Sequence, residues 1–266
     1  MNNRANLWDK ISTLLYPLAF GVLIIVLWQT EILHKILGAD NFTLPLPGRI
    51  FNIIDDNLPA IMVNVQATLI VAVGGLLLGS LLGYGLGILA AIFTKWGKGG
   101  LTLASAFNAI PIIAIAPILN NLTKDFSSDA NIRSMFAKIL VVTITSTVAM
   151  SVNAYRGLTE LRPYSLDLMH SYAATPRQIF FKLRLPNSVP FIFTALRVSV
   201  PGSVISALVS EYFAEYIVGV GRMIRENIVL AQYATAWAYI TVACLMGIAM
   251  YIVLLIFESV LLKGRK

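Results

Sequence analysis

Residues 155–190, YRGLTELRPYSLDLMHSYAATPRQIFFKLRLPNSVP, form the longest hydrophilic interruption in an otherwise apolar chain, and the rest of the sequence is arranged around them. They have the pattern of two short helices joined by a corner. Pro163 suits the first turn of the first helix, and Asp167 then lies near its positive end. The second helix begins with Thr-Pro-Arg-Gln at residues 175–178, where a threonine N-cap and a glutamine three residues later form a capping box.

An apolar face of the first of these helices includes Leu166, Met169 and Tyr172. Helices this short are only marginally stable alone in water, so another surface must hold them in place. Because most of the remaining chain consists of membrane-spanning segments, we expect that surface to belong to another protein.

The run from Asp167 to Pro186 resembles the cytoplasmic loop of bacterial ABC-importer permeases, which reads Glu-Ala-Ala, then Gly, then a terminal hydrophobe-x-Leu-Pro. The resemblance extends over residues 44–258 and is nearest to the nitrate, sulfonate, taurine and bicarbonate group of permeases. It implies that this loop is a coupling helix that docks on an ATPase subunit. The coupling residues it implies are Asp167, Leu168, Met169, His170, Ala173, Ala174, Pro176, Leu185 and Pro186.

One position in the loop departs from the family pattern, because Ala173 stands where the family has glycine. If that glycine adopts a left-handed backbone conformation, alanine there costs on the order of 1 kcal/mol. We therefore expect a corner that is tighter and more helical than the family's.

The composition is that of a polytopic membrane protein. Of the 266 residues, 58% are hydrophobic and 12% are charged, about half the charged fraction of a soluble domain. The basic residues lie in loops between apolar runs rather than on an aromatic-rich face, which argues against nucleic-acid binding. Cys244 is the single cysteine, so the chain has no internal disulfide and no cysteine-based metal site.

The hydropathy pattern predicts one all-α transmembrane domain, residues 1–266, with six spans, and the resemblance implies the type I ABC-importer permease fold. The predicted spans are residues 14–33, 60–93, 101–121, 134–153, 189–214 and 233–257, with the coupling loop at 155–188 and a surface helix at 48–57. This topology places 13 of the 20 Lys and Arg residues on the side of the termini and the long loop. The positive-inside rule therefore predicts that both termini are cytoplasmic.

Two further spans carry packing and kinking signals. Gly75, Gly79, Gly83 and Gly87 recur every four residues, so another helix can approach closely, either within this chain or from a second copy. In the third span, Pro111 and Pro117 each remove a helix hydrogen bond, so we expect a kink or break there, as in helices that line substrate paths.

The fifth span carries a set of hydroxyls on one helix face, at Ser199, Ser203, Ser206 and Ser210. We interpret this face, together with Pro111 and Pro117, as the lining of a translocation path. The alternative is hydrogen bonding between neighbouring spans. Past the end of this span, Gly219-Val-Gly221 resembles the Gly-Leu-Gly that follows an acidic position in the family.

The sequence has no phosphate-binding loop and no metal-ligand motif, so we expect no cofactor, no metal and no enzymatic activity in this chain. No span carries a charge at its centre, which argues against a proton-coupled carrier; Glu211 is the nearest candidate and lies toward one end. An energy-independent channel or secondary carrier, whose long loop is only an interfacial helix pair, remains the alternative class.

The resemblance further implies an ATP-binding-cassette ATPase, an extracytoplasmic solute-binding protein and a second permease subunit as partners, in the bacterial inner membrane. We expect a homodimer embedded in the lipid bilayer. The hydroxyl-rich face suits a weakly held polar solute such as nitrate, a sulfonate or bicarbonate. A vitamin or pyrimidine precursor is an equally compatible cargo.

Overall fold

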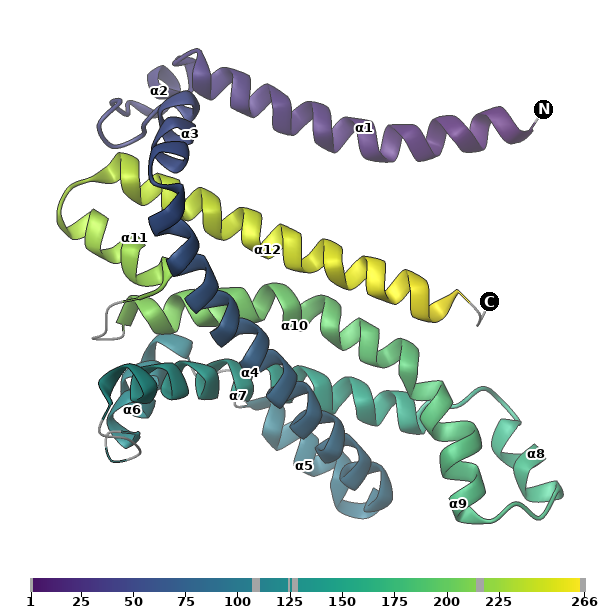
Figure 1. Ribbon diagram of the computed structural model, residues 1–266. Coiled ribbons are helices and arrows are strands. Elements are labelled where there is room, and N and C mark those ends of the chain that lie inside the picture. Colours follow the sequence, from purple (N-terminus) through teal and green to yellow (C-terminus); the bar gives the residue numbers. More distant parts are fainter. Residues whose placement is uncertain (1, 107–110, 124, 126–128, 214–217, 264–266) are drawn as a thin grey trace.

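The computed structural model describes residues 2–106, 111–123, 125, 129–213 and 218–263, and throughout these ranges the secondary structure is helical, with no strand (Figure 1). The helices are α1 (Asn2–Gln29), α2 (Ile32–Leu37), α3 (Pro47–Asp56), α4 (Leu58–Ile92), α5 (Thr94–Ala106), α6 (Ile112–Leu122), α7 (Ala130–Thr159), α8 (Ser165–Ser171), α9 (Pro176–Ile179), the π-helical turn η2 (Phe180–Arg184), α10 (Leu185–Phe213), α11 (Val220–Val229) and α12 (Tyr233–Leu262).

Within the described residues, four helices are long and apolar enough to cross a membrane: Leu58–Ile92, Ile132–Thr159, Pro176–Phe213 and Tyr233–Leu262. They correspond to the second, fourth, fifth and sixth predicted spans. A shorter apolar segment, Leu15–Gln29, lies in the first. The fold is therefore that of an all-helical, multi-pass membrane protein, as predicted.

The third predicted span is not one helix. It is divided between α5 and α6, and Pro111 is the N-cap of α6, where it lacks the N–H that a continuous helix would need. The predicted break is thus present. Residues 94–100, which separate the second and third predicted spans, are helical and belong to α5. This helix folds back on α4 so closely that a Cβ atom at Gly97 would collide with the carbonyl of Ala90.

The centre of the bundle is the contact between α4 and α7, with α10 packed on α7. The four-residue glycine stripe of α4 faces α7 inside the same chain. A Cβ atom on Gly79 would lie 2.6 Å from the carbonyl oxygen of Thr143, and one on Gly87 would lie 2.6 Å from the Cβ of Ala154. Gly75 and Gly83 meet α7 in the same way. This geometry matches the first of the two interpretations, packing within the chain.

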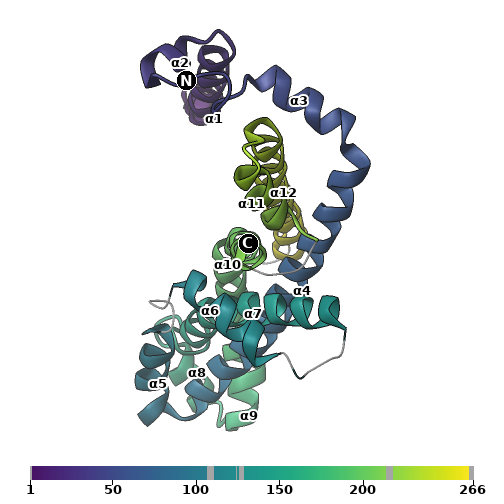
Figure 2. The same ribbon diagram turned by 90° about the vertical axis from the view of Figure 1, so that its left-hand side faces the viewer.

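The first helix stands apart from the bundle (Figures 1 and 2). It contacts α2 and α3, and Trp28 at its end packs edge-on against Trp237 of α12 with ring centroids 5.4 Å apart. The described α1 side chains from residue 15 to 20 are exposed. The amphipathic α3 forms where the surface helix was predicted.

Figure 1 shows α8, α9, the N-terminal end of α1 and the C-terminal end of α12 at one end of the bundle. At the other end lie α2, α3, α6 and α11. We call these the loop end and the far end. The interruption between spans at the loop end is shorter than the predicted 155–188, because α7 continues to Thr159 and a continuous helix begins at Pro176.

Candidate functional site

The hydrophilic loop forms a helix–corner–helix unit at the loop end. The first helix, α8, begins at Ser165 rather than at Pro163, because Tyr164 adopts a left-handed conformation with φ 62° and serves as its N-cap. The Ser165 hydroxyl also donates to the Arg162 carbonyl at 2.6 Å, which closes the turn before the helix. The predicted role of Pro163 is therefore wrong, whereas Asp167 lies in the first turn as expected.

The corner after α8 is a left-handed C-terminal cap in which alanine occupies the position usually given to glycine. Ala173 has φ 51°, its N–H donates to the His170 carbonyl at 2.9 Å, and the N–H of Ala174 donates to the Met169 carbonyl at 3.0 Å. The expectation of a more helical corner is wrong: these two hydrogen bonds keep the left-handed turn despite the Cβ atom.

The second half of the loop starts at the predicted capping box. Thr175 Oγ1 accepts from the Gln178 N–H at 3.3 Å, and Gln178 Oε1 accepts from the Thr175 N–H at 2.8 Å. From Pro176 the chain continues through α9, the η2 turn and α10 as a single helix of 38 residues ending at Phe213. One helix therefore joins the loop to the far end.

Three exposed aromatic and apolar side chains lie on α8 or at its caps, beside the exposed Asp167 and His170. Tyr164, Leu168 and Tyr172 are spaced four residues apart, and their exposed fractions are 83%, 58% and 79%. Leu166 and Met169 are half-buried on the other side. The sequence predicted that Tyr172 shares an apolar face with Leu166 and Met169. This prediction is wrong, because Tyr172 is exposed while the other two are half-buried. This solvent-facing stripe has no covering element in the described part of the chain.

The loop is fixed to the spans by side chains around the start of α10. Asn187 Nδ2 donates to the Gly157 and Glu160 carbonyls at 2.8 and 3.0 Å and so caps the end of α7. Tyr84 of α4 and Ser188 share a hydrogen bond of 2.8 Å. Leu185 and Pro186, at this junction, are half-buried.

A hollow of about 460 Å³ lies between the loop and the end of α4. It is lined by Ala91, Ile92, Leu166, His170, Pro176, Ile179, Phe180 and Arg184.

The hydroxyl face of α10 is buried against the rest of the bundle, with exposed fractions between 1% and 5% for Ser199, Ser203, Ser206 and Ser210. Ser206 lies 3.2 Å from Thr145 of α7, while Ser203 and Ser210 donate to carbonyls of their own helix. Within one chain these hydroxyls therefore occupy a helix contact. Pro111 and Pro117 are exposed on α6, which packs on α7 and α10.

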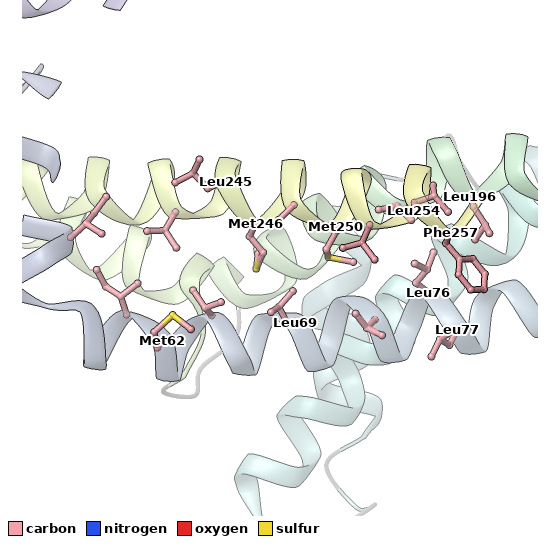
Figure 3. Close-up of a pocket in the computed structure, with 18 of the residues that line it drawn as sticks. Met62, Leu69, Leu76, Leu77, Leu196, Leu245, Met246, Met250, Leu254 and Phe257 are labelled. Carbon is pink, nitrogen blue, oxygen red and sulfur yellow. The ribbon is translucent and has the colours of Figure 1, made fainter. Parts of the chain in front are cut away.

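A groove of about 790 Å³ lies between α4 and α12 (Figure 3). Its lining is apolar throughout, with Met62, Leu69, Met246, Met250 and Phe257 among the side chains that point into it. A polar solute would lose its hydrogen bonds to water there without replacing them. The groove is therefore not the site for a polar cargo.

A polar cluster is buried at the far end, where α10 ends and α11 begins. The Glu211 side chain is completely buried, and its Oε2 atom accepts from Thr68 Oγ1 of α4 and from the Gly221 N–H, both at 2.9 Å. Thr68 Oγ1 in turn accepts from the Val220 N–H at 3.0 Å. The Gly219 N–H donates to Asn64 Oδ1 of α4 at 2.9 Å.

A third span also reaches this backbone segment. Lys138 of α7 is buried, and its Nζ lies 3.4 Å from the Val218 carbonyl oxygen. The glycines are required by the close fit: a Cβ atom at Gly219 would collide with the Glu211 carboxyl group, and one at Gly221 would collide with the Leu208 carbonyl. We call the set of Asn64, Thr68, Lys138, Glu211 and backbone 218–221 the α11 junction.

Glu211 and the Gly-Val-Gly motif stand out separately in the sequence, but their partners were not predicted. Asn64 and Thr68 are polar residues four positions apart in a mostly apolar span, which is a signal for one buried polar face. Two basic residues lie inside membrane-crossing helices rather than in loops. Lys138 lies inside α7, and Arg197 lies inside α10, where it makes a two-bond pair with Glu258 of α12 at 2.7 and 3.0 Å.

Fold and site together describe a helical membrane permease with a protruding helical loop at one end. Residues 83–264, more than half of the chain, match the family described as binding-protein-dependent transport system inner membrane component. The chain therefore belongs to this family and is a non-catalytic membrane subunit of an ABC importer.

Individual relatives agree with this assignment. The chain is 29% identical over 253 residues, 95% of its length and 96% of the relative's, to the formylaminopyrimidine transport permease protein ThiX of Halalkalibacterium halodurans. It is 28% identical over 90 residues, 34% of its length and 32% of the relative's, to the bicarbonate transport system permease protein CmpB of Synechocystis sp.. A chain of the inward-facing MetNI methionine ABC transporter shares the fold, with a TM-score of 0.58 and 16% identity over 72% of this chain and 93% of that one.

Proposed function

We propose that α8 and the corner at Ala173 dock on an ATP-binding-cassette ATPase on the cytoplasmic side of the membrane. The observation that carries this proposal is the exposed stripe of Tyr164, Leu168 and Tyr172 on a short helix that is fixed at both ends. Aromatic and apolar side chains of this kind form the centres of protein interfaces. The residues expected to take part are those predicted, from Asp167 to Pro186.

The same docking requires a particular orientation and further partners. With the loop end in the cytoplasm, both termini are cytoplasmic and the far end faces an extracytoplasmic solute-binding protein. We propose a homodimer, because the α4–α12 groove and the exposed side of α1 offer apolar surface that only lipid or a second copy can cover in a membrane. The lining of the path by the α10 hydroxyls and by Pro111 and Pro117 remains a prediction.

For the cargo, we propose a small polar solute of the pyrimidine-precursor class. The support is the similarity to the formylaminopyrimidine permease, which covers nearly the whole chain. A bicarbonate-like anion is the second candidate, supported by the shorter similarity to the bicarbonate permease. Ligand screening of the cognate binding protein by calorimetry separates the two, because heat of binding is expected with a formylaminopyrimidine and not with bicarbonate in the first case, and the reverse in the second.

The coupling role is tested by reconstituting the permease with its ATPase and binding protein in liposomes. Reversing the charge at Asp167 with Asp167→Lys is expected to abolish ATP-dependent import while passive leakage stays unchanged. Asp125→Lys, at the other end of the molecule, is the matched charge-reversal control. Import that continues in the Asp167→Lys protein, or that proceeds in wild type without ATP, would favour a channel or secondary carrier.

A further inference from the structure

The α11 junction has no role in the function derived so far, yet it joins four helices at a single point. Four successive backbone positions are held by side chains from different spans: the Val218 carbonyl by Lys138 of α7, the Gly219 and Val220 N–H groups by Asn64 and Thr68 of α4, and the Gly221 N–H by Glu211 of α10. A segment bound at each residue in this way cannot slide along its neighbours without breaking all four bonds.

Glu211 lies at the end of the longest helix in the described chain. That helix begins at Pro176, directly after the loop corner, and at 1.5 Å per residue its 38 residues measure about 57 Å along the helix axis. It bends near the η2 turn and runs from the loop end to the far end of the bundle (Figure 1). The loop and Glu211 are therefore joined by continuous helix, through which a displacement of the loop can reach Glu211.

The helix that receives this motion is α11, which packs on α4, α10 and α12 at the far end. Its first two residues, Val220 and Gly221, are the ones bound at the junction. Helix N-terminal N–H groups have no partners within their own helix, so the side chains of the junction supply the bonds that these residues lack. A carboxylate at this position also interacts favourably with the helix dipole.

We infer that Glu211 is a positioning residue that locks α11 to the end of the loop-connected helix, so that α10 and α11 move as one body when the loop moves. The inference rests on the proposed function, because it assigns a path for motion that the ATPase would generate. The Glu211 carboxylate holds α11 through the Gly221 N–H, and without this carboxylate α11 no longer follows α10.

The first test compares variants that remove the acceptor of this hydrogen bond with one that keeps it. Glu211→Ala is expected to retain the ATPase and its hydrolysis but to lose solute import, whereas Glu211→Gln is expected to retain import because its amide oxygen still accepts from Gly221. Thr68→Val, which keeps the side-chain shape and removes the hydroxyl, should weaken import in the same direction. Normal import by Glu211→Ala would overturn the inference.

The second test asks whether a covalent link can replace the hydrogen bond. Arg225 of α11 reaches the Tyr212 carbonyl of α10 at 3.3 Å, so cysteines at 212 and 225 are close enough for a short bismaleimide, in a Cys244→Ser background. Crosslinked protein with Glu211 intact should import normally, and the crosslink should restore import to Glu211→Ala. The single-cysteine variants treated with the reagent are the controls.

Failure of the inference differs from failure of the proposed function. If the crosslink blocks import while the unlinked protein imports in an ATP-dependent manner, α11 must move against α10 and the inference is wrong, although the importer assignment stands. If the unmodified protein neither binds an ATPase nor imports with ATP, the proposed function fails first, and the inference about transmitted motion fails with it.

Discussion

Gly79 of α4 lies so close to Thr143 of α7 that a single added methyl group would meet the Thr143 carbonyl oxygen at 2.6 Å and the Cβ atom of Ser146 at 2.7 Å. Neither atom belongs to a flexible side-chain end, so the helices would have to separate. Overpacking of this kind typically costs about 1–3 kcal/mol. We therefore expect Gly79→Ala to lower the unfolding temperature of the purified protein.

The control lies on the same helix. Gly85 has open space around the position of an added Cβ atom, and replacing a helical glycine by alanine gains up to about 1 kcal/mol in helix propensity. Gly85→Ala should therefore be neutral or stabilising in the same thermal-unfolding measurement. Equal effects of the two substitutions would contradict the close packing of α4 on α7.

The left-handed alanine of the coupling loop gives a prediction of the opposite sign. Because Ala173 has φ 51°, Ala173→Gly should relieve backbone strain and stabilise the loop by about 1 kcal/mol. Ala174→Gly, one residue further on, lacks a positive φ and should bring no gain. Hydrogen exchange of the loop amides distinguishes the two, with slower exchange expected only for Ala173→Gly.

The capping box at the start of the second loop helix should also be measurable. Thr175→Ala removes the acceptor of the Gln178 N–H, and loss of such a cap typically costs about 1 kcal/mol. Thr175→Ser keeps the oxygen and should behave like wild type. We expect faster amide exchange at residues 177–179 in the alanine variant alone; unchanged exchange would mean that the helix is held only by α10.

The Arg197–Glu258 pair joins α10 to α12 by two charge-assisted hydrogen bonds. Glu258 is only 13% exposed, whereas Arg197 is half exposed, so removing the arginine leaves a largely buried carboxylate without its partner. The double variant Arg197→Met/Glu258→Met should therefore be less destabilised than the sum of the effects of Arg197→Met and Glu258→Met. A double-mutant cycle with additive changes in unfolding temperature would show that the pair is inert.

Local signals in the sequence predicted local structure well. Apolar runs located the long helices, Pro111 located the break before α6, and Thr175 with Gln178 located the start of the second loop helix. Each of these features depends on residues that are adjacent or within one helical turn of each other. The family assignment likewise followed from the loop, which is contiguous in the sequence.

Features that depend on distant residues could not be predicted in this way. Periodicity placed the four α10 serines on one face, but nothing in the sequence stated that this face packs within the bundle. The bond between Thr68 and Glu211 joins residues 143 positions apart. The left-handed Tyr164 and Ala173 were also missed, because hydrogen bonds in the surrounding turns, rather than residue type, impose their conformation.

The central claim is that the exposed stripe on α8 docks on an ATPase, and a pull-down of the detergent-solubilised permease with its ATPase tests it most directly. Leu168→Glu places a charge in the middle of the stripe, and Leu122→Glu changes another exposed leucine, at the far end. We predict that wild type and Leu122→Glu retain the ATPase and that Leu168→Glu loses it. Retention of the ATPase by Leu168→Glu, or its absence from wild type, would contradict the claim.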